Sequence, residues 1–276
     1  MLTKVGDDAW APYVREALRR FGVDPAYVGV SPDLQTPVVF CALDPAEDPL
    51  LMFYRAPIAP DLTLGDGDVP WDLIESVPLL WVTGSGVSVQ PARDTQLAML
   101  ARRGRSVVGS GRWTVLDLDW RPMFWPSPDD ARAQYAAMLD HVDVVVGNRA
   151  EVEVAVGTAD PEEAARRLLD HGVRLALVKK GAEGVLVATP ERVVTVPPHP
   201  VKVLCGLGAG DAFGAALAHG LLADWDPTRV AAYANAAGAI VASRLACADA
   251  MPTLDELTTM VDSADAEPTQ STGVRA

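Results

Sequence analysis

The sequence is poor in the residues that build disulfide frameworks and metal clusters. Among its 276 residues there are three cysteines and four histidines. Cys41, Cys205 and Cys247 are far apart and odd in number, and the histidines show no metal-binding spacing. A disulfide framework or a CxxC metal motif is therefore not indicated, and we expect the reduced thiols of a cytoplasmic protein.

Positive charge is also scarce. The chain has 23 Lys and Arg against 37 Asp and Glu, which gives a formal net charge of −14. A nucleic-acid partner is disfavoured, because this charge would repel a phosphate backbone. An anionic small molecule is still compatible with the composition, since a few basic side chains in a cleft can outweigh the overall field.

Long apolar runs are missing as well. No stretch approaches the ~20 apolar residues that span a bilayer, and no apolar segment of the signal-peptide kind follows the first residues. We therefore expect no membrane contact and, by elimination, a cytoplasmic location. The apolar share is nevertheless 49%, enough for the buried core of one large α/β domain or two small ones.

Short apolar strands alternate with helices along most of the chain. After a helix over Trp10–Phe21, the runs Val38–Leu43 and Leu50–Arg55 read as a hairpin, and we expect a small β lid over about 36–56. Further strands are expected over 79–83, 115–118, 142–147, 175–179, 185–188 and 193–196, and further helices over 92–101, 128–139, 161–171, 209–222, 227–246 and 253–263. The pattern predicts an α/β domain over 1–263 with a mostly parallel, doubly wound sheet, and a disordered tail over 264–276. Ligands of such sheets lie outside the carboxyl ends of the strands, so polar residues directly after strands are site candidates.

The strongest such candidate is the glycine-rich run from Gly206 to Asp211, which leads into a helix. Glycines allow close approach of the backbone to a ligand, and a helix N-terminus offers free N–H groups to phosphate. Asp211 in the first turn could take a proton from an attacking hydroxyl. An acidic residue that merely stabilises the helix start is an equally weighted interpretation. The run is neither a dinucleotide fingerprint nor a Walker A loop.

Two further candidates follow neighbouring strands. Asn148 and Glu151 lie three residues apart on a first helical turn, where they could organise Mg²⁺; an N-terminal capping box is the favoured alternative. Asp117, Asp119 and Arg121 are placed on one side by the period-two alternation of a strand. They could clamp a ligand or form a structural Asp–Arg pair.

Weaker signals complete the set. Lys179 and Gly181 belong to a strand, basic pair and glycine turn that could lie along a nucleotide, or could be a plain turn with solvated lysines. Arg55 lies on the expected lid, where it could bind an anion or simply be exposed on an edge strand. Asn235 lies on a helix of small residues, which could leave room for an adenine ring but more often indicates tight packing.

These segments together resemble the pfkB, or ribokinase-like, carbohydrate kinases. Gly208-Ala209-Gly210-Asp211 is similar to the family signature, and Asn148-Arg149-Ala150-Glu151 is similar to its N-x-x-E motif. The segments 53–55, 116–122, 203–211 and 239–253 add to the resemblance, which covers the chain from Lys4 to about Val261. Several motifs recur in order, so the resemblance is specific.

The resemblance implies a cofactor pair, ATP and Mg²⁺, and a role for each candidate residue. Asp211 would be the catalytic base, and Gly208, Ala209 and Gly210 would form the anion hole. Lys179, Gly181 and Asn235 would lie near ATP, and Asn148 and Glu151 would organise Mg²⁺. Arg55, Asp117 and Arg121 would face the substrate, and the arginines favour a sugar acid. The reaction would be ATP-dependent phosphorylation of a sugar-acid hydroxyl; another sugar or nucleoside kinase, or a catalytically weak nucleotide-binding remnant, is the alternative.

The resemblance begins late. The family opens with a strand that carries a substrate-binding Asp and a Gly-Gly segment, whereas Leu2–Asp8 corresponds to a later point. We therefore expect an N-terminally incomplete ribokinase-like fold, with an exposed strand edge that could support a homodimer. Gly206 also replaces a residue that is commonly Thr or polar, which bears on the identity of the substrate.

Overall fold

The computed structural model describes residues 1–47 and 49–266. These residues divide into two compact units. The first comprises Met1–Ala42, Leu50–Lys180 and Leu186–Val194, and the second comprises Leu43–Pro49, Gly181–Val185 and the chain from Thr195 onward. The expectation of one kinase domain over 1–263 stays a prediction.

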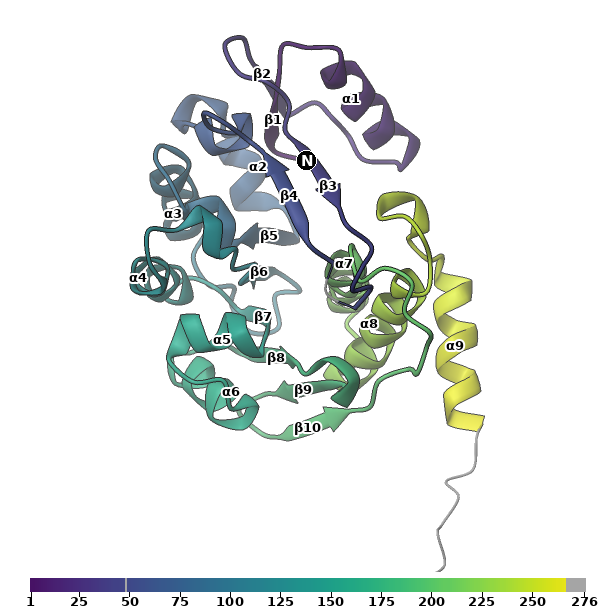
Figure 1. Cartoon of the computed structure of the whole chain (residues 1–276). Helices are drawn as coiled ribbons and strands as arrows, with labels where there is room; N and C mark the ends of the chain where they lie inside the picture. The colour runs from purple at the N-terminus through teal and green to yellow at the C-terminus, as the bar shows by residue number, and fades with distance from the viewer. Residues whose placement is uncertain (48, 267–276) are drawn as a thin grey trace, which may run out of the picture. The chain divides into compact units, whose positions relative to one another are not determined.

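A six-stranded sheet, in the order β10-β9-β8-β7-β6-β5, is the main framework (Figure 1). Its strands are β5 (Leu79–Thr83), β6 (Trp113–Asp117), β7 (Val144–Asn148), β8 (Leu175–Lys179), β9 (Val185–Ala188) and β10 (Val193–Val196). Strands β5 to β8 pair in parallel. The helices between and after them are α3 (Ala92–Arg103), α4 (Pro128–Leu139), α5 (Arg149–Val156) and α6 (Pro161–Asp170). The predicted α/β class with a mostly parallel sheet is confirmed.

The parallel strands form because their residues are apolar on both faces. In β7 the residues Val144, Val145 and Val146 are each at most 1% exposed, and β8 is buried from Leu175 to Val178. Continuous apolar runs of this kind suit a strand that is covered on two sides. The boundaries of β5, β8, β9 and β10 coincide with the prediction, whereas β6 and β7 begin or end one or two residues away from it.

A small parallel pair of strands near the N-terminus was not predicted. β1 (Thr3–Gly6) pairs with β2 (Val28–Ser31), and the predicted helix between them is α1, Trp10–Arg20. Val5, Ala11 and Val28 form a core cluster of their own. Each strand is four residues long and contains a glycine, so neither gives a clear period-two signal.

The predicted hairpin is present as β3 (Val38–Cys41) and β4 (Leu51–Tyr54), which pair antiparallel. Its strand residues are half-buried or exposed, and Tyr54 is 64% exposed. After the hairpin, two 3₁₀ helices, η1 (Pro60–Thr63) and η2 (Asp66–Asp68), lead to α2 (Trp71–Ser76).

The second unit is built from α7 (Ala209–Leu222), α8 (Pro227–Ala242) and α9 (Leu254–Ala266). α8 ends four residues before the predicted Ala246, where Ser243 Oγ donates to the carbonyl of Ile240 at 2.7 Å. α9 extends past the predicted start of the tail at 264, and the remaining tail residues, 267–276, lie outside the described residues. In the part of the chain that the structure describes, no helix combines the length and apolarity needed to cross a bilayer.

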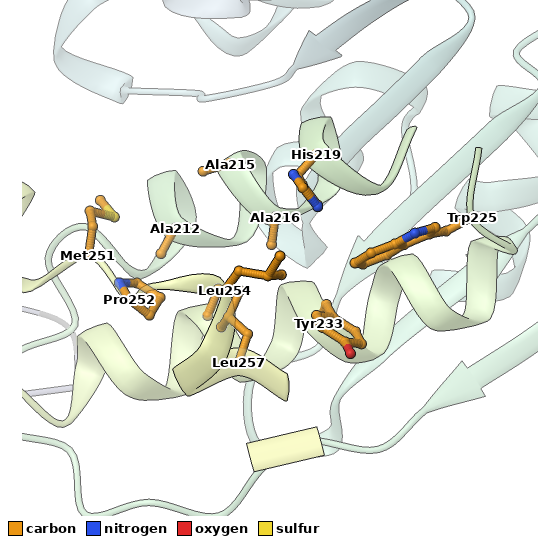
Figure 2. A pocket seen from close by; sticks show the side chains of 11 residues that line it. Ala212, Ala215, Ala216, His219, Trp225, Tyr233, Met251, Pro252, Leu254 and Leu257 are labelled. Carbon is orange, nitrogen blue, oxygen red and sulfur yellow. The ribbon is translucent and has the colours of Figure 1, made fainter. Parts of the chain in front are cut away.

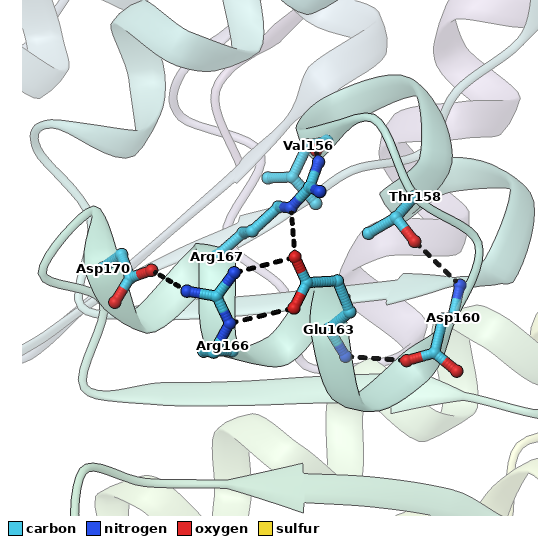
Figure 3. A network of polar contacts seen from close by, with 7 residues as sticks. All are labelled: Val156, Thr158, Asp160, Glu163, Arg166, Arg167 and Asp170. Carbon is cyan, nitrogen blue, oxygen red and sulfur yellow. Dashed lines mark hydrogen bonds and ion pairs between the residues drawn. The ribbon is translucent and has the colours of Figure 1, made fainter.

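A charge network holds the first turns of α6 (Figure 3). Arg166 contacts Glu163 through two nitrogens at 2.7 and 2.9 Å, and Arg167 Nε donates to Glu163 Oε1 at 2.8 Å. Asp160 caps the helix by accepting from the N–H of Glu163 at 2.8 Å. Hydrogen bonds from Arg166, then from Arg167, lower the pKa of Glu163 from 4.5 to about 2.

We expect this network to make stability depend on pH in the acid range. The pKa of Glu163 is lower in the folded chain, so its contribution is fully present above pH 4.5 and is lost as the pH falls towards 2. Glu163→Gln should therefore lower Tm at pH 7, and the difference from wild type should shrink below pH 4.5. Thermal melts between pH 3 and 7 measure this. Glu162→Gln, an exposed neighbour in the same turn, is the control; an equal effect of both variants would contradict the assignment.

Candidate active site

The carboxyl ends of the parallel strands bring several predicted site residues to one edge of the sheet. Asp117 is the last residue of β6 and pairs in register with Thr83 of β5. Asn148, which ends β7, pairs with Lys179, which ends β8. Side chains after parallel strands form the ligand-binding edge of such sheets. The structure therefore places Asp117, Asn148 and Lys179 at the predicted edge.

Asn148 and Glu151 form the capping box that was the favoured alternative. Asn148 Oδ1 accepts from the N–H of Glu151 at 2.9 Å, and Glu151 Oε2 accepts from the N–H of Asn148 at 2.6 Å. Lys179 Nζ lies 3.8 Å from Glu151 Oε2. Glu151 is 7% exposed, and a carboxylate this buried needs such partners. The three side chains are thus brought together on the first unit.

The chemistry of this set fits Mg²⁺ only in part. Amide and carboxylate oxygens are suitable donors, and Mg²⁺ commonly keeps several waters beside one or two carboxylates. The structure offers one carboxylate here, and among the described residues no group of three or more His, Cys, Asp or Glu could hold a metal ion. A magnesium ion at Asn148 and Glu151 would therefore need ligands from water and phosphate as well.

The segment after β6 departs from the predicted alternation. β6 ends at Asp117, and Asp119 has a φ of 35°, a left-handed backbone that is rare outside glycine. Asp119 accepts from Ser85 Oγ at 2.5 Å and from Arg121 Nε at 2.9 Å. The prediction that Asp117, Asp119 and Arg121 share one side of a continuing strand is wrong. The alternative of an Asp–Arg pair is what the structure contains.

Arg55 lies one residue beyond β4 and is held on two sides. Its Nη2 contacts both carboxylate oxygens of Asp61, at 2.8 and 3.1 Å. Its guanidinium carbon lies 4.8 Å from the ring centroid of Phe124, which in turn contacts Phe53 edge-on at 5.4 Å. Nε and Nη1 make no hydrogen bond among the described residues, so three N–H groups stay available to a ligand.

A cleft of about 490 Å³ lies beside Arg55 in the first unit. Its lining residues are Asp8, Ala9, Trp10, Gln35, Thr36, Val38, Phe53, Tyr54, Arg55 and Ala56. Asp8 accepts from the N–H and the hydroxyl of Thr36 at 2.7 and 2.9 Å. The backbone hydrogen bond from Thr36 lowers the pKa of Asp8, so this carboxyl is ionised at neutral pH. Sequence reasoning missed Asp8 and Thr36, because the two residues are far apart in the chain and no local pattern connects them.

The predicted anion loop begins α7 in the second unit. Gly208 caps the helix with a φ of 86°, and the N–H of Ala212 donates to its carbonyl at 2.9 Å. The N–H of Gly206 donates to the carbonyl of Ala46 at 2.8 Å, and a Cβ on Gly206 would lie 2.7 Å from the carbonyl of Glu47. This close approach explains why glycine stands at 206 in this chain. The N–H of Gly210 has no partner among the described residues, which suits an anion-binding helix start.

The other predicted residues of the second unit are placed as follows. Asp211 is exposed in the first turn of α7. The amide of Asn235 on α8 donates to the carbonyls of Val196 and Pro197 at 3.3 and 2.8 Å. Gly181, with a φ of 62°, begins the short 3₁₀ helix η5 (Gly181–Glu183) and has open space around it.

An apolar cleft of about 210 Å³ lies between α7, α8 and α9 (Figure 2), and Asn235 is not among its lining residues. Tyr233 and Ala237 line it from α8, and residues four apart share one helix face. Asn235 lies two residues from each, so it is not part of that face. Trp225 packs against His219 at 5.1 Å and Tyr233 at 4.7 Å between ring centroids. The interpretation that the small residues of α8 leave room for an adenine ring stays a prediction.

Known proteins with similar sequences and folds are sugar kinases. The sequence model of the pfkB family carbohydrate kinases matches residues 1–254. The 5-dehydro-2-deoxygluconokinase of Clostridium perfringens is 28% identical over 92% of this chain and 75% of its own, and that of Bacillus subtilis is 28% identical over 94% and 79%. The Vibrio cholerae fructokinase, crystallised with fructose, ADP and calcium, aligns with a TM-score of 0.82 at 26% identity over 94% of this chain and 84% of its own. The chain therefore belongs to the pfkB family of carbohydrate kinases and has the ribokinase-like α/β fold.

Proposed function

We propose that the protein uses ATP to phosphorylate a sugar acid, 5-dehydro-2-deoxygluconate, to its 6-phosphate, a step of myo-inositol breakdown. The observation that carries this choice is Arg55, which lines the cleft and keeps its Nε and Nη1 donors available. A guanidinium is well suited to a carboxylate, because it offers parallel N–H groups and a permanent positive charge. The names of the similar kinases support the same substrate.

The transfer itself would rest on the start of α7. The 6-hydroxyl oxygen attacks the γ-phosphorus of ATP, the bond to the β-phosphate oxygen breaks to release ADP, and the hydroxyl proton passes to the carboxylate of Asp211. The N–H groups of Gly208, Ala209 and Gly210 would stabilise the charge of the phosphoryl group in transfer. This arrangement uses a helix N-terminus as the phosphate site.

Other residues would bind the nucleotide and its metal. Lys179, Gly181 and Asn235 would lie along ATP, and Asn148 with Glu151 would hold Mg²⁺ partly through water. When bound, Mg²⁺ neutralises charge on the phosphate oxygens. The ion pair between Lys179 and Glu151 supports this assignment, because it keeps a cation at the end of β8 and a buried carboxylate in the first turn of α5 together.

The substrate would be bound by Arg55, Asp117 and Arg121. Arg121 is already paired with Asp119 through Nε and Nη2. Arg55 uses a single nitrogen for its partner. We therefore assign the carboxylate of the substrate to Arg55 and a secondary, hydroxyl-binding role to Asp117 and Arg121.

ADP release in the presence of ATP and Mg²⁺ tests the proposal on a panel of 5-dehydro-2-deoxygluconate, fructose, ribose and adenosine. We expect turnover of the sugar acid above the neutral compounds. Arg55→Ala should lower kcat/KM for the acid by about 10- to 100-fold, the value of a lost hydrogen-bonded charge contact. Turnover of a neutral compound alone would favour another sugar or nucleoside kinase. ATP binding without any turnover would favour the nucleotide-binding remnant.

A further inference from the structure

The hairpin alone does not fix the position of Arg55. Arg55 follows β4, whose residues are half-buried or exposed, and among the described strands β4 pairs with β3 alone. Isolated two-stranded hairpins are marginally stable in water. An arginine at the end of such a hairpin would sample many rotamers, and ordering a long side chain costs conformational entropy. Its position must therefore come from contacts outside the hairpin.

Asp61, by contrast, lies on an anchored segment. Its neighbours Pro60 and Leu62 are buried, and Leu62 is 8% exposed. The turn is closed by Thr63 Oγ1, which donates to the carbonyl of Pro60 at 2.7 Å. Lys4 Nζ on β1 donates to the carbonyl of Thr63 at 3.1 Å. The backbone of Asp61 is thus held by packing and hydrogen bonds that do not involve the hairpin.

Contacts from Asp61 and Phe124 define where the guanidinium of Arg55 lies. The carboxylate of Asp61 accepts hydrogen bonds from Nη2 of Arg55, and the ring of Phe124 covers one face of the guanidinium. Asp61 does not line the cleft, whereas Arg55 does. Apart from the field of its charge, an effect of Asp61 on a ligand in the cleft would therefore act through Arg55.

The charge of Asp61 opposes anion binding. A carboxylate beside Arg55 neutralises part of the field that would attract an anionic ligand. A site selected for charge alone would have no acid at this place. Asp61 can therefore favour ligand binding only through geometry. It holds Nε and Nη1 of Arg55 in one orientation, so that less conformational entropy of this side chain is lost when a ligand binds.

We propose that Asp61 is a positioning residue that orients Arg55 for the carboxylate of the substrate. The inference rests on the proposed function, in which Arg55 binds a sugar acid. It predicts that the hydrogen-bond acceptor at position 61 matters more than the negative charge.

Four variants test this by steady-state kinetics with 5-dehydro-2-deoxygluconate and ATP. Asp61→Ala should raise KM for the sugar acid about tenfold, with kcat within about twofold of wild type and KM for ATP unchanged. Asp61→Asn keeps an acceptor for Nη2, so its KM should stay within about threefold. Asp66→Ala removes an equal charge from the exposed neighbouring helix η2 and should change nothing. Arg55→Ala is the reference for loss of the arginine.

The double variant Arg55→Ala/Asp61→Ala separates positioning from an independent effect. If Asp61 acts through Arg55, the double variant should have the KM of Arg55→Ala alone. Additive losses would overturn the proposal, as would wild-type KM in Asp61→Ala or equal losses in Asp61→Ala and Asp61→Asn. If Arg55→Ala raised KM for the sugar acid and Asp61→Ala left it unchanged, this inference alone would be overturned. If the wild type did not turn over the sugar acid, or if Arg55→Ala left kcat/KM for it unchanged, both the proposed function and this inference would be overturned.

Discussion

Replacing Asp211 with asparagine should lower kcat for sugar phosphorylation by about 10²–10⁴-fold, the usual contribution of a positioned general base. Asparagine has nearly the same shape but cannot accept the hydroxyl proton. Asp211 is exposed in the first turn of α7, so the substitution should leave the fold intact. ADP release measures kcat, and nucleotide titration should give a Kd for ATP close to that of wild type.

The matched control is Asp262→Asn, which removes an equal charge from an exposed position on α9. It should keep wild-type kcat. If Asp211→Asn retained more than about a tenth of wild-type kcat, Asp211 would be a helix-stabilising residue, and the base would have to be sought elsewhere. A loss of ATP binding in Asp211→Asn would instead point to a role in the nucleotide site.

The central sheet could be predicted because its strands carry their own signal. Val144–Val146 and Leu175–Val178 are apolar without interruption, and only strands covered on both faces or buried helices have this pattern. β7 and β8 are each five residues long, a length that favours strands over helices. β1 and β2 carry no such run, and their pairing depends on packing around Val5 and Val28, which local sequence does not report.

The local geometry of the candidate site could be predicted only in part. The spacing of Asn148 and Glu151 indicated both a capping box and a metal motif, and the hydrogen bonds confirm the box. The left-handed backbone of Asp119 could not be foreseen, because it is imposed on a residue type that only occasionally adopts it. Asp61 was missed as well. The signal available was an acid six residues after Arg55 and directly after Pro60.

Gly208→Ala should be the most damaging small substitution in the anion loop. The φ of 86° costs a residue with a Cβ about 1–2 kcal/mol. The added Cβ would also lie 2.7 Å from the Sγ of Cys247, closer than Cβ atoms approach other atoms in folded proteins, and 3.3 Å from its Cα, a tight contact. The loop would have to move, and the N–H groups at the start of α7 would move with it. We expect kcat to fall by about 10²–10³-fold, as when a donor to a transition-state oxyanion is lost.

Two further variants separate the contributions of backbone strain and of the contact with Cys247 to the fall in kcat. Gly22→Ala introduces a Cβ at a φ of 73° in open space, so it should lower Tm slightly and leave kcat unchanged. Cys247→Ala removes the Sγ, so the double variant Gly208→Ala/Cys247→Ala should recover part of the lost kcat while the strain remains. Full activity of Gly208→Ala would contradict an anion-binding role for this loop. A loss of kcat that Cys247→Ala does not relieve would assign the whole effect to the backbone of Gly208, because its left-handed conformation alone would then set the direction of the N–H groups.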